Sequence, residues 1–295
     1  MSVLTPVRLE SIADRVQIAP GVLMPRLGMG TSHAETGAPV ESELLTGFEL
    51  GYRGIDTAAM YDNEDGVGRA IRESHLPRED VFVTTKVWNS DQGYRPTLDA
   101  FDRSAARLGL EYVDLYLIHW PQPRQTLDTW RALEELHASG RARAIGVCNF
   151  LPAHLDDLLS HANVPPAVNQ VELHPLLPQH ELRDYCAVRG IVVQAWAPIM
   201  RGGVADIAEL VRIGDRYGKT AAQVSLRWIL QSGLTTIPKS VHRSRLAENA
   251  DVFDFELSAA DLGAIESLTG ERRIGAHPMT HARLAPFMRF VRSPR

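Results

Sequence analysis

The sequence is poor in cysteine and contains no long apolar run. Its 295 residues include only two cysteines, Cys148 and Cys186, which is too few for a disulfide framework. The N-terminal stretch MSVLTPVRLESIADRVQ lacks the apolar segment of a signal peptide. No apolar run approaches the roughly 18 residues that a membrane-spanning helix needs. We therefore expect a cytoplasmic protein that does not bind a membrane.

Charge of one sign is not concentrated anywhere in the chain. Its 31 Lys and Arg residues and 36 Asp and Glu residues give a net charge of −5. The absence of a basic block argues against nucleic acid as a partner. No His/Cys cluster has the spacing of metal ligands, so we expect no metal.

Several common site signatures are missing as well. Gly28 and Gly30 lack the third glycine of the GxGxxG dinucleotide fingerprint. Gly218-Lys219-Thr220 resembles the end of a P-loop, but the earlier glycine, Gly214, stands one position away from the place that the motif requires. The HExxH and GxSxG motifs do not occur.

What the chain does have is a regular alternation of β-branched and amphipathic segments. Strands are expected at Arg26–Thr31, Arg53–Asp56, Val81–Lys86, Val113–His119, Ala144–Cys148, Val168–Glu172, Ile191–Trp196 and Thr235–Pro238. Helices are expected at Glu41–Leu50, Glu64–Glu73, Thr97–Leu108, Leu127–Ala138, Pro152–Ser160, His180–Arg189, Ala205–Tyr217, Ala221–Gln231, Arg243–Ala250 and Ser258–Leu268.

Eight strands, each followed by a helix, predict a (β/α)₈ barrel. The apolar strand VFVTTK fits this fold, because parallel strands are covered on both faces. The alternative is an open, doubly wound sheet. A hairpin at Val16–Met24 is expected before the barrel, turning at Pro20-Gly21, and an extra helix and loop after it. No linker divides the chain, so residues 1–295 are expected to form one domain.

Polar side chains gather where the expected strands end. They are Asp56, Lys86, His119, Asn149, Gln170, Trp196 and Lys239-Ser240, with Tyr61 in the loop after Asp56. Each alone has an ordinary structural explanation, such as a capping carboxylate or a loop-packing phenol. The carboxyl ends of barrel strands meet at one mouth, where active sites lie. Together these residues predict a site there.

Four of these residues suggest proton transfer. A free phenol has a pKa of about 10, which makes it a poor acid at neutral pH. A Lys86 ammonium about 4 Å from Tyr61 is worth about 4 kcal/mol at a dielectric near 20, and would lower that pKa by up to about 3 units. Asp56 would keep Lys86 charged, and His119 would orient a substrate oxygen toward the phenol.

The motifs DTAAMY at 56–61, TTKVW at 84–88, LIHWP at 117–121, GVCNF at 146–150 and IPKSVHRSRLAENADVFDFEL at 237–257 resemble those of the aldo-keto reductases. The resemblance covers essentially the whole chain, with the motifs in family order. It is strongest to the prokaryotic branch that includes the 2,5-diketo-D-gluconate reductases, partly on Trp196 in QAWAP.

The resemblance implies an NADPH-dependent, monomeric reductase of small aldehydes or ketones. It implies Tyr61 as general acid, Asp56 and Lys86 as its tuning pair, and His119 as carbonyl orienter. The cofactor residues it implies are Thr31, Cys148, Asn149, Gln170, Trp196, Pro198, Gly202, Lys239, Ser240, Val241, Arg245, Glu248 and Asn249. The substrate-pocket residues it implies are Ser32, Trp88 and Trp120.

The chain departs from the family pattern at several positions. Cys148 replaces a serine beside Asn149, Ser32 replaces a bulky aromatic, and APIMRGG at 197–203 replaces the usual pyrophosphate loop. Arg245 has an alternative role as a solvated residue paired with Glu248. Two other functions stay open: a cofactor-sensing regulatory protein on the same barrel, and a TIM-barrel lyase or isomerase.

Overall fold

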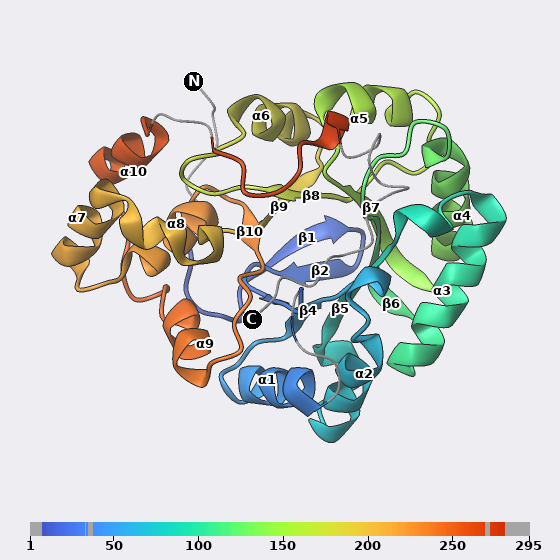
Figure 1. The fold of residues 1–295 in the computed structure, drawn as a ribbon, viewed down its shortest axis with the longest axis horizontal. Helices are drawn as coiled ribbons and strands as arrows, with labels where there is room; N and C mark the ends of the chain where they lie inside the picture. Colours follow the sequence, from blue (N-terminus) through green and yellow to red (C-terminus); the bar gives the residue numbers. More distant parts are fainter. Residues whose placement is uncertain (1–7, 33, 35–37, 269–271, 281–295) are drawn as a thin grey trace.

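A computed structural model describes residues 8–32, 34, 38–268 and 272–280. Eight parallel strands stand next to one another in chain order. They are β3 (Met29–Gly30), β4 (Gly54–Asp56), β5 (Phe82–Val87), β6 (Val113–Ile118), β7 (Ala142–Cys148), β8 (Val168–Glu172), β9 (Val192–Trp196) and β10 (Thr235–Thr236). A parallel bridge between Leu27 and Thr236 joins the two edges of this sheet, so the strands form a closed ring (Figure 1).

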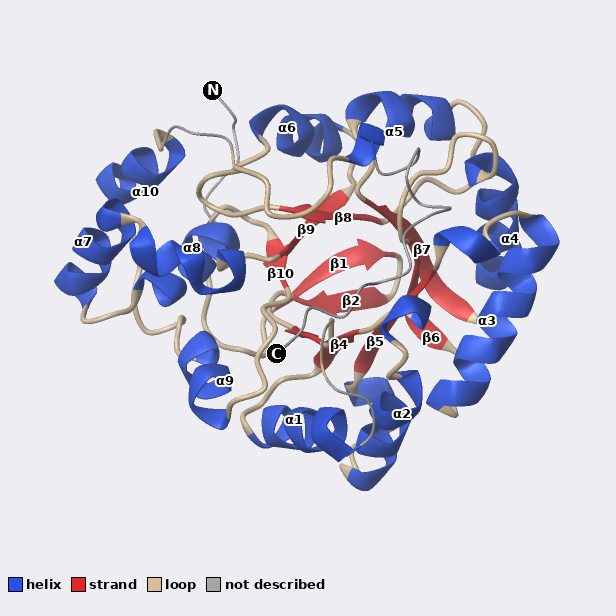
Figure 2. Ribbon diagram, viewed as in Figure 1, coloured by secondary structure: helices blue, strands red, loops and turns tan. Residues whose placement is uncertain are grey.

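Helices surround the ring of strands, as Figure 2 shows in blue around red. They are α1 (Ala38–Glu49), α2 (Glu64–Glu73), α3 (Tyr94–Leu108), α4 (Thr126–Ala138), α5 (Pro152–Leu159), α6 (His180–Val188), α7 (Ala208–Tyr217), α8 (Ala221–Gln231), α9 (Arg243–Ala250) and α10 (Ala259–Glu266). The strands are covered on both faces, and all six residues of β5 and of β6 are buried. The (β/α)₈ barrel predicted from the sequence is confirmed.

The N-terminal hairpin closes one end of the barrel. Strands β1 (Arg15–Ala19) and β2 (Val22–Pro25) pair antiparallel around Gly21, whose φ of +72° suits glycine. Ile18, Val22 and Met24 form a hydrophobic cluster with residues of the barrel interior, including Leu115 and Cys148. The opposite end, where the strands finish, stays available for a site.

Most observed boundaries differ from the expected ones by one to three residues, with β3, α1 and α3 each beginning three residues away, and two of the differences have a local reason. The strand expected at 235–238 ends at Thr236, two residues before Pro238, which has no N–H to donate to a neighbouring strand. The helix expected from Ala205 begins only at Ala208, because a 3₁₀ stretch, η4 (Met200–Asp206), precedes it. Left-handed backbone at Arg201 and Gly202 interrupts that stretch.

The ends of the chain lie partly outside the described residues. The structure describes the N-terminal part of the chain from residue 8, and it describes the loop expected after the last helix as far as residue 280, without residues 269–271. Within the described part of the chain, no helix is both long and apolar enough to cross a membrane.

Candidate active site

Asp56, Tyr61 and Lys86 meet at the mouth of the barrel. β4 ends at Asp56, and the short 3₁₀ helix η1 (Ala59–Tyr61) turns the chain so that the phenol comes back over the strand ends. Lys86 is fully buried on β5. Its Nζ donates to the Asp56 carboxylate, to the Thr57 carbonyl oxygen at 2.9 Å and to the Tyr61 hydroxyl at 3.4 Å. The structure therefore brings together three of the four residues expected to be catalytic.

The burial of this cluster governs its protonation. Burial raises the pKa of the Asp56 carboxyl, and the Lys86 charge offsets only part of that effect. Burial alone would lower the pKa of Lys86, but the negative charge of Asp56 raises it above its ordinary value. Lys86 is therefore a permanent cation in this site.

Lys86 lowers the pKa of Tyr61, as expected, but the net shift of that pKa is upward. Burial raises the pKa of Tyr61 above its ordinary value, and the attraction of the Lys86 ammonium is the smaller effect. The loss of water around the buried phenol outweighs the charge of Lys86. Tyr61 is therefore a protonated phenol at neutral pH.

His119, the fourth expected catalytic residue, follows β6 directly and stands beside the phenol. Its ring lies edge-on to Tyr61, with centroids 5.7 Å apart, and edge-on to Trp88 at 5.0 Å. The imidazole therefore faces the same space as the phenol. A carbonyl oxygen in that space would meet both groups.

The residues implied for the nicotinamide form a connected set on β7, β8 and β9. Gln170 donates from Nε2 to Asp56 at 2.6 Å and to Gln194 at 2.7 Å. Asn149 donates to the His119 carbonyl oxygen at 3.0 Å and accepts from Trp196 Nε1 at 2.9 Å. These bonds tie the expected cofactor residues to the catalytic cluster.

Cys148 lies beneath this set. Its buried Sγ is 3.8 Å from Gln170 Oε1. Burial raises the pKa of the thiol, so it is protonated and can act only as a weak donor.

The residues implied for the adenosine end lie on and before α9. Asn249 is buried, and its Nδ2 has no hydrogen-bond partner within the described part of the chain. Ser240 Oγ accepts from the backbone N–H of His242 at 3.2 Å, and Val241 is exposed. Lys239, just before Ser240, is partly exposed. Glu248 accepts from Thr220 Oγ1 at 2.6 Å.

Arg245 is exposed and forms no ion pair with any residue that the structure describes. Its alternative partner, Glu248, is bonded to Thr220 instead. The described structure thus leaves this cation available at the surface of α9.

The other expected cofactor residues line the same end of the barrel. The Thr31 hydroxyl donates to the Asp56 carbonyl oxygen at 3.1 Å, which holds the start of the first loop against β4. Pro198 is buried after β9, and its carbonyl oxygen accepts from Ser225 at 2.7 Å. Gly202 is exposed with a φ of +98°, after Met200 and Arg201 at +51° and +55°. The backbone N–H groups of Met200 and Gly202 donate to the carbonyl oxygens of Ala197 at 3.0 Å and Ile199 at 2.8 Å, so this loop is closed by its own backbone bonds.

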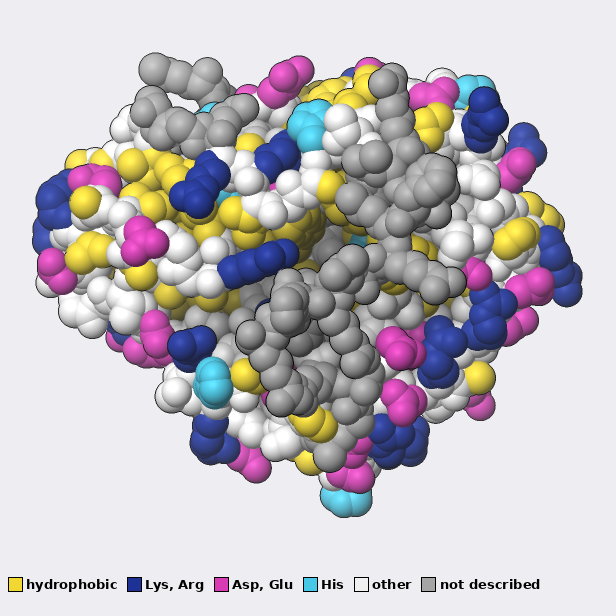
Figure 3. All heavy atoms as spheres, in the orientation of Figure 1, with side chains coloured by type: hydrophobic (Ala, Val, Ile, Leu, Met, Phe, Trp, Pro, Cys, Tyr) yellow, Lys and Arg dark blue, Asp and Glu magenta, His cyan; other side chains and the backbone are white. Residues whose placement is uncertain are grey.

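Of the three expected substrate-pocket residues, Trp88 is the one that the ring contacts place beside His119. Trp88 touches His119, and Trp120 is buried, with its carbonyl oxygen accepting from Gln92 at 2.8 Å. Ser32 is partly buried after Thr31. In Figure 3 the face toward the viewer is hollowed near its centre, and hydrophobic side chains and a Lys or Arg side chain border the hollow.

One polar residue at the mouth was not anticipated from the sequence. Glu172 ends β8 with a fully buried carboxylate, and it accepts hydrogen bonds from a segment 102 residues further along the chain. Its pKa is lowered, because bonds from His174 and from the backbone of Ile274 and Gly275 outweigh the effect of burial. The sequence does hold one indication of it: Glu172 stands two residues after Gln170, and residues two apart on a strand share a face.

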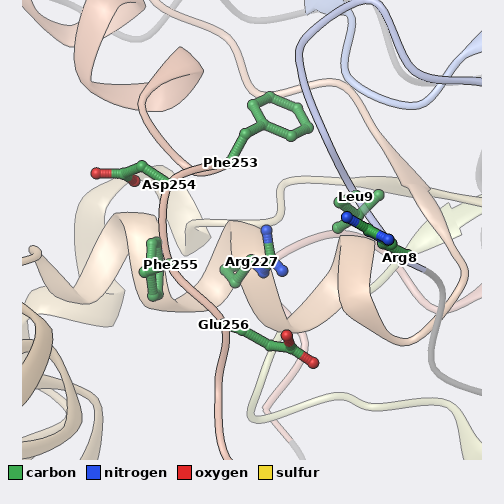
Figure 4. Close-up of a pocket in the computed structure, with 7 residues that line it drawn as sticks. All are labelled: Arg8, Leu9, Arg227, Phe253, Asp254, Phe255 and Glu256. Atoms are coloured by element: carbon green, nitrogen blue, oxygen red, sulfur yellow. The ribbon is translucent and has the colours of Figure 1, made fainter.

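A pocket lies away from this site, on the outside of the barrel (Figure 4). It is lined by Arg8, Leu9, Arg227, Phe253, Asp254, Phe255 and Glu256. Arg227 donates to Gln231 at 3.0 Å and to the Val252 carbonyl oxygen at 3.1 Å, so it fastens the loop after α9 to α8. None of the expected site residues lines this pocket.

The barrel and its site have the form of a known class of oxidoreductase. The sequence model of the aldo/keto reductase family matches residues 26–269. The chain therefore belongs to the aldo/keto reductase family, as its motifs indicated.

Individual relatives match this chain over nearly its full length and theirs. Glyoxal reductase of Bacillus subtilis is 51% identical, over 91% of this chain and 97% of its own. Methylglyoxal reductase DkgA of Escherichia coli is 42% identical, over 89% of this chain and 96% of its own. The crystal structure of a Bombyx mori aldo-keto reductase in complex with NADP superposes with a TM-score of 0.84, at 32% identity, over 92% of this chain and 97% of that one. The expected resemblance to the prokaryotic branch of the 2,5-diketo-D-gluconate reductases, to which DkgA belongs, is confirmed.

Proposed function

We propose that this oxidoreductase uses NADPH to reduce small aldehydes and ketones to alcohols. The observation that supports this most directly is the buried Asp56–Lys86 pair in contact with the Tyr61 hydroxyl, beside His119. A protonated phenol next to a permanent cation is a proton donor whose conjugate base is stabilised in place.

Each residue has a distinct role in this proposal. His119 orients the carbonyl oxygen toward the Tyr61 hydroxyl, which donates its proton to that oxygen. The bound cofactor supplies the hydride. Lys86 acts mainly after the proton has moved, because its ammonium stabilises the phenolate of Tyr61. Asp56 holds Lys86 in position by accepting a hydrogen bond from its ammonium.

The described residues fit NADPH. Asn249 has a buried amide nitrogen without a partner in the described part of the chain, as an adenine acceptor would require. Arg245 is an unpaired cation among the described residues, suited to a 2′-phosphate. Lys239 and Ser240 precede it, and Asn149, Gln170 and Trp196 surround the expected nicotinamide position. A relative of this chain has been crystallised with NADP.

The names of two relatives support small α-oxoaldehydes as the substrate class. Two relatives carry names that denote reduction of glyoxal and of methylglyoxal, both small α-oxoaldehydes. The proposal is tested by NADPH oxidation with glyoxal, methylglyoxal, an α-keto acid, a diketone and a keto-sugar. We expect the two oxoaldehydes to give the highest kcat/KM. Absence of NADPH oxidation with every carbonyl would refute the proposal.

The remaining expectations are proposed on indirect support. One hydrophobic core runs from Leu9 to Ile265, which favours a single domain. Large exposed hydrophobic side chains are scattered over separate elements, which favours a monomer. Composition favours a cytoplasmic protein without nucleic acid as partner. A regulatory, non-catalytic role finds no support in the assembled cluster or in the relatives.

A further inference from the structure

The segment Arg272–Thr280 lies along the edge of the barrel mouth formed by the ends of β8 and β9. In Figure 1 it runs in red past β9 and β8 toward α5. The backbone N–H of Arg272 donates to the Leu176 carbonyl oxygen at 3.0 Å, which brings the segment to the loop after β8. Residues far apart in sequence thereby meet at the end of β8.

Glu172 is the principal anchor of this segment. Its two carboxylate oxygens accept from successive backbone N–H groups, of Ile274 at 2.6 Å and of Gly275 at 3.2 Å. His174 Nε2 lies 3.3 Å from the same carboxylate, and Arg273 Nη1 lies 3.8 Å away. Two adjacent N–H groups on one carboxylate fix the register of the segment as well as its position.

The anchored segment presses on Trp196. A Cβ added to Gly275 would lie 2.4 Å from Cη2 of the Trp196 indole, so the glycine backbone packs directly against the ring edge. At the opposite end of the indole, Nε1 donates to Asn149 at 2.9 Å. The ring is therefore held at both ends, by Asn149 and by Gly275.

We propose that Glu172 is a positioning residue for cofactor binding, because it fastens Ile274 and Gly275 against the edge of the Trp196 indole. The fastened segment keeps the ring in the orientation that receives the nicotinamide. This inference rests on the proposed function, in which Trp196 contacts NADPH. Glu172 itself touches neither cofactor nor substrate.

A carboxylate is required at this position. Asp would retract the acceptors by one methylene. Gln keeps the length but turns an NH₂ group toward one of the two backbone N–H groups, which then has no acceptor. Glu172→Gln is therefore the sharpest single change, and Glu172→Asp should recover part of the loss. Glu79→Gln, at an exposed carboxylate in the turn before β5, is the matched control.

The first experiment measures NADPH dissociation constants by fluorescence titration and amide hydrogen exchange at Ile274 and Gly275. For Glu172→Gln we expect exchange at both amides at least tenfold faster and NADPH binding about tenfold weaker. KM for the carbonyl, at saturating NADPH, should change less than twofold. Glu79→Gln should match wild type. Faster exchange with NADPH affinity unchanged would overturn the proposal, because Glu172 would then be a structural anchor only.

A second variant approaches the same contact from the other side. Gly275→Ala retains the Glu172 side chain, but its Cβ would lie 2.4 Å from the Trp196 ring edge and 3.1 Å from a Glu172 carboxylate oxygen, so the segment and the ring must move apart and NADPH binding should weaken at least fivefold. Its control is Gly263→Ala in α10, where an added Cβ meets nothing within 4 Å. Unchanged NADPH affinity in Gly275→Ala would overturn the proposal even if Glu172→Gln failed to fold.

These readouts separate the two proposals. Binding and exchange need no turnover, so a wild-type protein that binds NADPH but reduces no carbonyl would refute the proposed function alone. A wild-type protein that does not bind NADPH would refute both. Normal wild-type catalysis with NADPH affinity unaffected by either variant would refute the positioning role alone.

Discussion

A buried aspartate lies at each end of the barrel, and the two aspartates have different partners. At the mouth, Asp56 contacts the fully buried Lys86 and the Gln170 amide, with Tyr61 and Cys148 close by. At the closed end, Asp114 on β6 accepts from Arg78 at 2.9 Å, from Arg143 at 3.0 Å and from the Val83 backbone N–H at 2.9 Å.

The two sites differ in how far their cationic side chains are exposed to water. Arg78 and Arg143 keep part of their side chains in water, and Arg143 also donates to the Gly21 carbonyl oxygen of the hairpin. These arginines fasten the hairpin and strands together, which is a structural role. Lys86 has no exposed surface and instead points at a phenol that can give up a proton. A buried ion pair indicates chemistry when a titratable, substrate-accessible group completes it.

The largest expected effect comes from removing the phenol at the mouth. Tyr61→Phe should lower kcat/KM for carbonyl reduction by about 10²–10⁴-fold, because a general acid contributes about that much. NADPH binding should stay within about twofold, since other residues hold the cofactor. Steady-state kinetics and fluorescence titration measure the two quantities. Tyr94→Phe, at an exposed phenol on α3, is the control. Turnover within tenfold of wild type would remove Tyr61 from the acid role.

The closed end should respond in stability and not in activity. Asp114→Asn leaves two arginines without their anion, and we expect a loss of about 3 kcal/mol in the free energy of unfolding, since both can still reach water. Asp102→Asn breaks an exposed pair with Arg141 and should cost less than about 1 kcal/mol. Denaturant unfolding gives both values. A folded Asp114→Asn protein with strongly reduced kcat would contradict the division of roles between the two ends.

A third test compares two arginines on the same helix at the mouth. Arg243 pairs with Glu49, whereas Arg245 has no ionic partner among the described residues. If Arg245 reads the 2′-phosphate, Arg245→Ala should lose about 1.5–3 kcal/mol of NADPH binding, at least tenfold, and barely change NADH binding. Arg243→Ala should change neither. Equal weakening of both cofactors by Arg245→Ala would mean that Arg245 supports the fold.

The mouth was more predictable from the sequence than the closed end, or than the contact by which Glu172 holds the segment at Gly275 against Trp196. Alternating segments located all eight strands, and polar residues at their ends located Asp56, Lys86 and His119, because these features are local in sequence. The direction of the Tyr61 pKa shift was missed, because it depends on how much water the folded site excludes. Glu172 was missed because its partners, Ile274 and Gly275, are distant in sequence and bind through backbone N–H groups, which no side-chain pattern reveals.

The smallest expected effect is at Cys148, where the two ends of the barrel meet. Its thiol contacts Gln170 of the mouth at 3.8 Å and belongs to the hydrophobic cluster that holds the hairpin. Cys148→Ser should leave NADPH binding equal or up to about threefold tighter, because a hydroxyl is the better donor to Gln170. It should also lose about 1 kcal/mol of stability, because a hydroxyl is less favourable among apolar side chains.

The control for this last change is Cys186→Ser, at a buried thiol on α6 in the other hydrophobic cluster. It should lose stability without changing NADPH affinity, as measured by denaturant unfolding and fluorescence titration. If Cys148→Ser instead weakens NADPH binding together with stability, the thiol serves the mouth through packing. Packing at Cys148 would then couple the mouth to the closed end of the barrel. A substitution at the closed end would be expected to change NADPH affinity.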